Sequence, residues 1–261
     1  MTAKLGLIGA GMINTQIAHL ATRVGINVML SNTRGPESLQ DLVDELGPHA
    51  QAGTIADAAA FSDLVSVSIP FGAYASLPAD ALARKIVIDT MNYYPGRDGD
   101  FPEVAERTIT TSELLQQHLP DANVVKALHN LDALHLLNGA RPDNRQNRWA
   151  LPVAGDDQTA KNRVIELLDQ IGYDGVDCGT LADSWRIEAD TPIYVNPYVG
   201  PTPDGLTLDE QIDWYATDTA AVVTRADVER MAAEATRKAP AGGRPTSLHR
   251  AWTGYLARLH S

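Results

Sequence analysis

Hydrophobic and polar positions alternate along the first part of the chain in a way that predicts a strand, a tight turn, a helix and a second strand. Residues 4–9 form a short apolar run, and residues 26–30 form another. Between them, apolar side chains recur at helical spacing at Ile13, Ile17 and Leu20. The whole unit spans about thirty residues, which is the length that a parallel crossover needs.

The same alternation continues to about residue 178. Further strands are predicted at 50–53, 64–69, 86–89, 124–126, 149–154 and 175–178, and helices at 37–46, 55–61 and 157–172. Parallel strands are buried on both faces and are therefore apolar without strict alternation, as these runs are. The pattern predicts an α/β fold, a Rossmann-type doubly wound parallel sheet with helices on both faces.

Beyond about residue 183 the pattern changes to irregular chain and helices. Prolines interrupt the segment 192–203, Thr224 is placed to cap a helix that runs to about Lys238, and a last helix carries Leu248, Trp252, Tyr255, Leu256 and Leu259. We expect a main domain over residues 1–150, its continuation over 151–182, and a smaller, mainly helical region over 183–261 that provides substrate or dimer contacts.

Composition and charge restrict the class of protein. Hydrophobic residues make up 44% and charged residues 21% of the chain, as in ordinary globular proteins. No apolar run approaches the roughly 20 residues of a membrane span, and a net charge of −12 opposes binding to nucleic acid and anionic membranes. The single cysteine, Cys178, is expected to be a small core residue near a strand end. It fits a reducing cytoplasm, where we expect the protein to reside.

A glycine turn lies where the first strand meets the first helix. Gly9 and Gly11 let the backbone approach a pyrophosphate at the start of that helix, whose first residues are Met12 and Ile13. The full dinucleotide fingerprint would place Gly or Ala three residues after Gly11, where this chain has Asn14. The turn nevertheless predicts dinucleotide binding, and we assign residues 1–150 to that function.

The end of the second strand predicts which dinucleotide is bound. An NAD enzyme usually has Asp or Glu here to accept from the ribose 2′-hydroxyl, whereas this chain offers hydroxyl, amide and guanidinium groups at Ser31, Asn32, Thr33 and Arg34. These groups suit a 2′-phosphate and predict NADP(H). The alternative is a polar turn that caps the helix beginning near Pro36.

Two further strand ends would lie at the same edge of the sheet, where open α/β sheets bind their ligands. Ile69, Pro70 and Phe71 follow the fourth strand and would pack on the nicotinamide side, unless they form a plain turn with a core aromatic. Asn92 ends the segment after the fifth strand and would contact ribose or substrate, although Asn is also a common turn residue.

Polar residues cluster after the sixth strand. A helix there would make either His129 and Asp132 or Asp132 and His135 neighbours. Their spacing is not that of a metal site, so we expect no metal. His129 either faces the substrate or is a structural histidine.

Together these features resemble the coenzyme F420-dependent NADP oxidoreductase family, and the nucleotide domain is also similar to that of pyrroline-5-carboxylate reductases. The resemblance rests on LGLIGAGMI, SNTRGPESL, VSIPF, IVIDTMNYY, VVKALHN, LPVAGDD and GTLADSWRIEADTP. It implies direct hydride transfer between NADP(H) and a deazaflavin, without metal or covalent intermediate, with His129 and Thr191 facing the deazaflavin. The chain differs from the family at Trp185, where arginine is frequent, and at Ala189, where serine is expected.

Three functions follow from this interpretation. The first is an NADP-dependent oxidoreductase that exchanges a hydride with coenzyme F420 or a similar flavin-like acceptor. The second is NADPH-dependent reduction of a small imine or carbonyl, with His129, Tyr93 or Tyr94 as the proton donor. The third is a non-catalytic NADP-binding sensor. The expected partners are a small substrate or a deazaflavin and, by analogy with small Rossmann reductases, a second copy in a homodimer.

Overall fold

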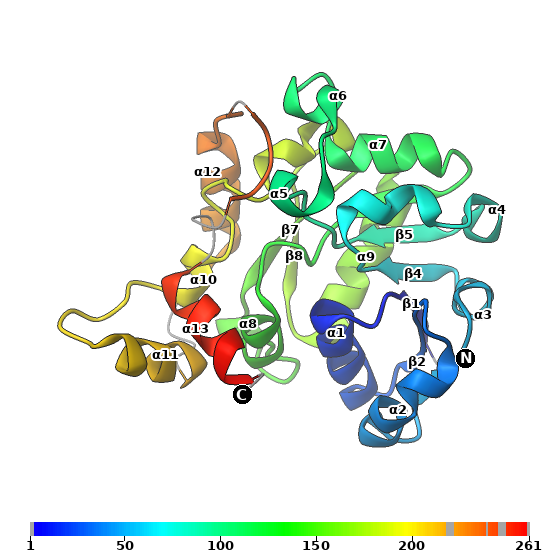
Figure 1. Ribbon diagram of the computed structural model, residues 1–261, viewed down its shortest axis with the longest axis horizontal. Coiled ribbons are helices and arrows are strands. Elements are labelled where there is room, and N and C mark those ends of the chain that lie inside the picture. Colours follow the sequence, from blue (N-terminus) through cyan, green and yellow to red (C-terminus); the bar gives the residue numbers. More distant parts are fainter. Residues whose placement is uncertain (1–2, 218–221, 239, 245–248, 260–261) are drawn as a thin grey trace.

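One eight-stranded sheet runs through the molecule in a computed structural model that describes residues 3–217, 222–238, 240–244 and 249–259 (Figure 1). The strand order is β3-β2-β1-β4-β5-β6-β7-β8. The strands are β1 (Lys4–Ile8), β2 (Asn27–Ser31), β3 (Ala50–Ala52), β4 (Leu64–Val67), β5 (Ile86–Asp89), β6 (Asn123–Lys126), β7 (Ala150–Gly155) and β8 (Asp174–Asp177). The strand order reverses between β1 and β4, which is the switch point where such sheets bind ligands.

The sheet is parallel from β3 to β6, but β7 runs antiparallel to β6, and β8 runs parallel to β7. The expected α/β fold is therefore confirmed, with the correction that its last two strands are reversed. The chain from β6 to β7 stays at the carboxyl edge and forms only α8 (Ala133–Asn138) and the short 3₁₀ helix Arg145–Asn147. Without a long helix to return it to the opposite edge, the chain re-enters the sheet in the reverse direction.

Helices cover both faces of the sheet. On one face the buried core receives side chains from α1 (Met12–Arg23), α2 (Gln40–Leu46) and α9 (Gln158–Ile171). On the other it receives them from α3 (Ile55–Phe61), α4 (Ala79–Leu82), α6 (Pro102–Ala105) and α7 (Thr111–His118). Shorter elements in the connections are α5 (Pro95–Asp98) and 3₁₀ turns at Pro36–Leu39, Phe71–Ser76 and Leu181–Arg186. The strands and helices expected up to residue 178 therefore occur within a few residues of their expected bounds.

The C-terminal region is helical, as expected. It contains α10 (Asn196–Val199), α11 (Leu208–Thr217), α12 (Arg225–Glu234) and α13 (Arg250–Leu259). Thr224 caps α12 as predicted, through a reciprocal pair with Asp227, but the helix ends at Glu234 and not near Lys238. Leu248, which we placed in the last helix, lies outside the described residues.

A third apolar cluster joins α11 and α13 to the rest of the molecule. The two helices lie side by side in Figure 1. Trp252 and Tyr215 are buried there, next to Ala133 of α8 and Tyr194. Cys178 is partly buried directly after β8 and packs against the main core, and burial raises the pKa of its thiol to about 11. In the described part of the chain, no helix is long and apolar enough to cross a membrane.

Candidate functional site

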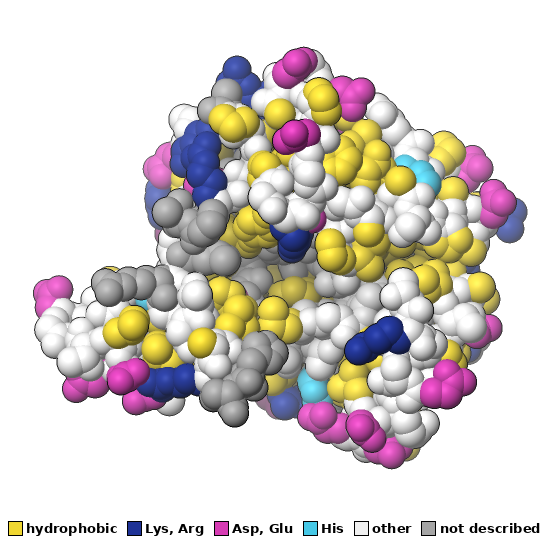
Figure 2. Space-filling model, in the orientation of Figure 1, with side chains coloured by type: hydrophobic (Ala, Val, Ile, Leu, Met, Phe, Trp, Pro, Cys, Tyr) yellow, Lys and Arg dark blue, Asp and Glu magenta, His cyan; other side chains and the backbone are white. Residues whose placement is uncertain are grey.

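A cavity of about 800 Å³ lies at the carboxyl edge of the central strands. In Figure 2 the middle of the displayed face is hollowed, with hydrophobic side chains around the hollow. Ligand pockets commonly measure roughly 300 to 1,000 Å³, so this volume suits more than one ring system. The lining residues are Gly11–Ile13, Ser68–Pro70, Thr90–Asn92, Tyr94, Gly96, Arg97, His129, Leu131–Ala133, Tyr194, Val195, Gly243 and Trp252.

The structure brings together seven of the residues predicted from the sequence. They come from three strand ends and one helix start, and all line the same cavity: Gly11, Met12, Ile13, Ile69, Pro70, Asn92 and His129. The other residues assigned to the nucleotide or the deazaflavin lie elsewhere, for reasons that differ between them.

The glycine turn has the geometry that the sequence predicts. Gly9 has a φ of +88°, and a Cβ atom there would lie 2.2 Å from the carbonyl oxygen of Ser68. Only glycine fits this position. A Cβ atom at Gly11 would meet nothing within 4 Å, so this backbone is open to the cavity at the start of α1. The exposed amides of a helix start attract an anion such as a pyrophosphate.

Asn14 occupies the third position of the fingerprint and has a structural function there. Its side chain is fully buried, and Nδ2 donates to the carbonyls of Ile8 (3.0 Å) and Gly9 (2.8 Å). Its Oδ1 accepts from the hydroxyl of Ser66 in β4 at 2.7 Å. The amide therefore ties the turn to the neighbouring strand, a task that a glycine or alanine could not perform.

Of the four predicted residues at the end of β2, some side chains point into the core and others into the solvent. The hydroxyl of Ser31 is buried and donates to the carbonyl of Leu7 at 3.0 Å, so it points into the sheet. Asn32 folds back, accepts from the backbone N–H of Arg34 and donates to Ser38. Thr33 and Arg34 are exposed. None of the four lines the cavity, and only Thr33 and Arg34 have side chains free to meet a phosphate.

Phe71 and Thr191 also lie outside the cavity. Phe71 is completely buried among Tyr74, Tyr93 and Phe101, which is the core aromatic of the alternative interpretation. Thr191 donates to the carbonyl of Glu188 at 2.7 Å and lines a separate pocket of about 280 Å³.

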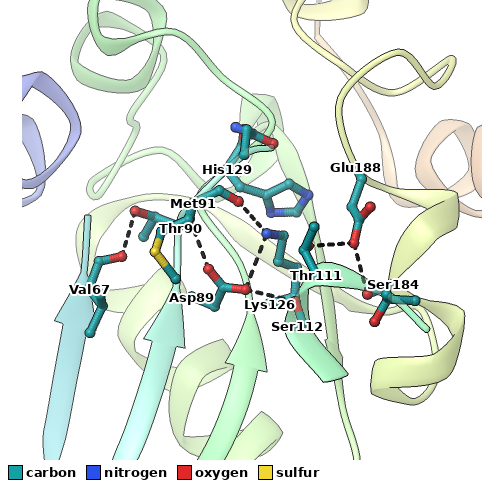
Figure 3. A network of polar contacts seen from close by, with 12 residues as sticks. Val67, Asp89, Thr90, Met91, Thr111, Ser112, Lys126, His129, Ser184 and Glu188 are labelled. Carbon is teal, nitrogen blue, oxygen red and sulfur yellow. Dashed lines mark hydrogen bonds and ion pairs between the residues drawn. The ribbon is translucent and has the colours of Figure 1, made fainter. Parts of the chain in front are cut away.

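A buried ion pair supports the cavity floor (Figure 3). The Lys126 ammonium at the end of β6 lies 3.2 Å from Asp89 Oδ2 at the end of β5, and both side chains are completely buried. Asp89 also accepts from Ser112 Oγ at 2.7 Å and from the Met91 N–H at 2.9 Å. Lys126 donates to the carbonyl of Met91. The pair thereby fixes the Met91–Asn92 segment, which lines the cavity.

His129 precedes α8 and is buried. Its Nε2 lies 2.6 Å from the carbonyl oxygen of Ile187 and must carry the proton, because a carbonyl only accepts. Burial and, to a smaller extent, the nearby Lys126 charge lower the pKa of His129 to about 3. The imidazole is therefore neutral at any ordinary pH. Its backbone carbonyl accepts from Asn92 Nδ2 at 2.7 Å.

The expected helix after β6 starts later than His129. Asp132 is its N-cap and accepts from the N–H groups of Leu134 and His135. Its second carboxylate oxygen accepts from His135 Nδ1 at 2.8 Å and from the Tyr215 hydroxyl at 2.6 Å. This network attaches α11 to the cavity wall. Among the described residues, no three His, Cys, Asp or Glu side chains are placed to hold a metal ion.

The prediction of the site missed lining residues that include Arg97, Tyr194, Val195 and Trp252, whereas Tyr94, named above as an alternative proton donor, does line the cavity. The hydroxyls of Tyr94 and Tyr194 are hydrogen-bonded to each other. Tyr194 and Val195 belong to the proline-interrupted segment, where no hydrophobic periodicity predicts a helix or a strand. Trp252 lies on the apolar stripe of the last helix, but a stripe shows only that a helix is packed and not what it packs against.

Asn92 provides a test of whether a nucleotide fits this cavity. Its Oδ1 atom is buried at the lining and has no hydrogen-bond partner in the described part of the chain. A buried acceptor without a partner is costly, and a carboxamide N–H of a nicotinamide would satisfy it. The fit extends to the open glycine backbone at Gly11 and to the apolar surfaces of Ile69 and Pro70.

Fold and site together define a Rossmann-type α/β protein with a cavity at the carboxyl edge of its sheet. Residues 4–93 match the family described as NADP oxidoreductase coenzyme F420-dependent, which confirms the resemblance found in the sequence. The chain is 31% identical to the F420-dependent NADP reductase of Methanocaldococcus jannaschii over 53% of this chain and 63% of that one.

Two other relatives extend the comparison. Metalloreductase STEAP3 of Rattus norvegicus is 29% identical over 71% of this chain, and the chain spans 36% of that protein's length. The crystal structure of a hypothetical protein from Sinorhizobium meliloti has a TM-score of 0.65 and 29% identity and covers 75% of this chain and 94% of that one. The Sinorhizobium structure shares the fold and names no activity, while the names of the other two relatives point to different acceptors, F420 in one case and a metal in the other.

Proposed function

We propose that the protein transfers a hydride directly between NADP(H) and a flavin-like ring, with coenzyme F420 as the first acceptor to test. The observation that carries the proposal is one continuous cavity that joins the phosphate turn to the C-terminal region. Gly11 and Trp252 line the same space, although they are far apart in the sequence. A dinucleotide at the sheet edge would leave room in this space for a second ring.

The cofactor would lie along the carboxyl edge of β2, β1, β4 and β5. Backbone amides at Gly11–Ile13 would hold the pyrophosphate, and Thr33 and Arg34 the 2′-phosphate. Ile69 and Pro70 would pack on the nicotinamide, and Asn92 Oδ1 would accept from its carboxamide. When bound, NADP(H) supplies or accepts the hydride at C4 of its nicotinamide.

The acceptor ring would lie between the nicotinamide and the C-terminal region. Most of the remaining lining is apolar, including Ile13, Leu131, Val195 and Trp252. Such walls exclude water and hold two flat rings against each other, and this juxtaposition provides most of the catalysis in a direct hydride transfer. His129 acts as a neutral positioning group, because an imidazole with a pKa of about 3 does not donate a proton near pH 7.

One observation favours a second candidate, the reduction of a small imine or carbonyl. The hydrogen-bonded hydroxyls of Tyr94 and Tyr194 lie at the cavity, and burial raises the pKa of both. Both therefore stay protonated and able to donate. Tyr93 does not share this position, because its hydroxyl donates to the carbonyl of Gly99 at 3.0 Å.

The test mixes the purified protein with oxidised F420 and either NADPH or NADH and follows the visible absorbance of the deazaflavin. We expect bleaching with NADPH and much slower bleaching with NADH. The same assay with ferric citrate, free flavins and small cyclic imines compares the alternative acceptors. NADPH oxidation by an imine but by no deazaflavin or flavin would replace the first candidate by the second.

The homodimer stays a prediction, since a single chain is described here. Light scattering on the eluate of a size-exclusion column measures the mass directly. A mass of one chain at assay concentration would contradict it.

A further inference from the structure

We propose that Arg97 forms an anion-binding subsite at the acceptor end of the cavity, which selects second substrates that carry a phosphate or carboxylate group. This inference rests on the proposed function, because it places the acceptor beside the nicotinamide. It adds the charge of the substrate, which neither the fold nor the comparisons specify.

Arg97 is the only basic side chain, other than the neutral His129, among the described residues that line the cavity. Asp132 is the only acidic one, and its carboxylate already accepts from His135 and Tyr215. The chain as a whole carries a net charge of −12. An anionic group that enters against this charge needs a local cation, and at the acceptor end Arg97 provides it.

The guanidinium of Arg97 is held in a fixed orientation. Nε and Nη2 donate to the two carboxylate oxygens of Asp98 at 2.8 and 2.9 Å, and Nη2 also donates to the carbonyl of Asn92 at 2.7 Å. The planar group lies 5.0 Å from the centre of the Tyr94 ring. A guanidinium that is fixed in this way loses little conformational entropy when it binds a ligand.

The two partners of this ion pair differ strongly in burial. The Asp98 side chain is 0% exposed, whereas that of Arg97 is 48% exposed. Asp98 also accepts from the Tyr94 N–H at 2.9 Å, and the Arg97 guanidinium helps to hold its pKa below the usual range. The negative end therefore lies inside the protein. The positive end faces outward, and Nη1 donates to no residue in the described part of the chain.

A purely structural arginine would use the same contacts to hold the loop and would show no preference among ligands. The two roles differ in what happens when only the charge of the ligand changes. Flavin mononucleotide and riboflavin share one ring system and differ by a phosphate. An N10-carboxyalkyl flavin and its N10-alkyl parent differ by a carboxylate. F420 and its neutral riboflavin-like core differ by the anionic tail.

The experiment measures the dissociation constants of these three pairs by fluorescence quenching, on the protein loaded with NADP⁺. In the wild type we expect the anionic member of at least one pair to bind about tenfold more tightly, as a hydrogen bond to a charged group allows. In Arg97→Gln we expect that preference to fall to within about twofold and the neutral members to bind as before. The pair that responds identifies phosphate or carboxylate as the preferred group.

Two controls separate this subsite from other effects. Arg145→Gln removes the same charge from an arginine that is 75% exposed and pairs with Asp169 away from the cavity, and we expect it to keep the preference. Arg97→Gln combined with Asp98→Asn removes the buried charge that the single variant leaves unpaired, and we expect it to behave as Arg97→Gln does. NADPH affinity should stay unchanged in all variants.

A preference for anionic ligands that survives in Arg97→Gln, or a wild type that binds both members of every pair equally, would overturn the subsite. Loss of NADPH affinity in Arg97→Gln would also overturn it, since the arginine would then contact the nucleotide. Failure of the proposed function looks different. In that case the wild type binds the ligands but reduces none of them.

Discussion

The two regions that enclose the cavity are built in different ways. The sheet edge presents residues that directly follow buried strands, and the Asp89–Lys126 ion pair fixes the segment between two of them. The C-terminal region presents Tyr194, Val195 and Trp252 from short helices and loops outside the sheet. It is attached through side chains such as Tyr215, which donates to Asp132, and through isolated backbone bonds such as that from the Val195 N–H to the Asn130 carbonyl at 2.9 Å. A wall held by side chains and isolated backbone bonds opens at a smaller free-energy cost than one held by paired strands.

This difference matches the division of tasks in the proposed reaction. The sheet edge would hold the nucleotide, which is the same in every turnover, and its geometry is set by the fold. The C-terminal region would hold the acceptor, and the residues that it contributes to the cavity lie outside the strands. The comparisons are consistent with that division, because the names of two relatives point to F420 in one case and to a metal in the other.

The largest expected effect is a loss of stability caused by a substitution at the sheet edge. Lys126→Met leaves Asp89 buried without its cation, which should lower the free energy of unfolding by about 3 to 5 kcal/mol. Lys85→Met is a matched control, since Lys85 also lies 3.2 Å from a carboxylate, but its partner Asp63 is 98% exposed. That variant should lose less than about 1 kcal/mol. Urea unfolding measures both, and equal losses would remove the distinction between the buried and the exposed pair.

The next effect concerns the attachment of the C-terminal region. Tyr215→Phe removes a buried hydrogen bond to the Asp132 carboxylate and should cost about 2 kcal/mol. The loss should be local, so hydrogen exchange should accelerate in α11 and α13 and stay unchanged in β1 and β4. Tyr255→Phe, in the same apolar cluster, is the control. Uniform acceleration across the sheet would show that the two regions unfold as one unit.

Arg34→Ala tests the outer end of the sheet edge. The exposed guanidinium should contribute about tenfold to NADPH affinity and nothing to NADH affinity. Arg23→Ala removes the same charge from the exposed far end of α1 and should affect neither nucleotide. Isothermal titration with both nucleotides measures the difference. Equal weakening of NADPH and NADH by Arg34→Ala would refute the 2′-phosphate assignment.

The strands and helices of the sheet half could be predicted because each one is encoded locally. Apolar runs of strand length, the Gly9 turn and the cap of α9 at Asp157 are features of single segments. The reversal of β7 could not be predicted. It occurs because the connection from β6 to β7 contains no helix long enough to return the chain to the opposite edge of the sheet. The same limit applies to the side chain of Ser31, whose direction is set by its hydrogen bond to a neighbouring strand.

The site was predictable only where it follows a strand. Ile69, Pro70 and Asn92 could be placed because carboxyl ends of parallel strands share one edge. Tyr194 and Trp252 could not be placed, because nothing in the sequence says where a helix outside the sheet will dock. Arg97 follows Asn92 closely in the sequence, and this could have placed Arg97 near the site. The adjacent Asp98 instead made Arg97 look like one half of an ordinary surface ion pair.

The smallest expected effect involves His129, which joins the two regions through its hydrogen bond to Ile187. Its pKa falls from 6.5 to about 3 in the folded protein. Below pH 6.5 the unfolded chain binds a proton that the folded one does not. The contribution of His129 to the free energy of unfolding is therefore fully present above pH 6.5. It is lost as the pH falls toward 3, by about 1 kcal/mol per pH unit.

His129→Gln should remove this acid dependence, whereas His19→Gln, on α1 beside Glu45, should keep it. Unfolding by urea at pH 5 and pH 7 gives the comparison. An activity profile with a midpoint near 6.5 that disappears only in His129→Gln would contradict the neutral histidine.

The most direct test of the account is to follow the hydride itself. NADPH labelled with deuterium at C4, on one face or the other, is mixed with F420 and the protein, and the reduced deazaflavin is analysed by mass spectrometry. Direct transfer within the cavity predicts that deuterium from one face alone appears at C5 of the deazaflavin and stays there. Deuterium lost to water, or equal transfer from both faces, would contradict two rings held together in this cavity.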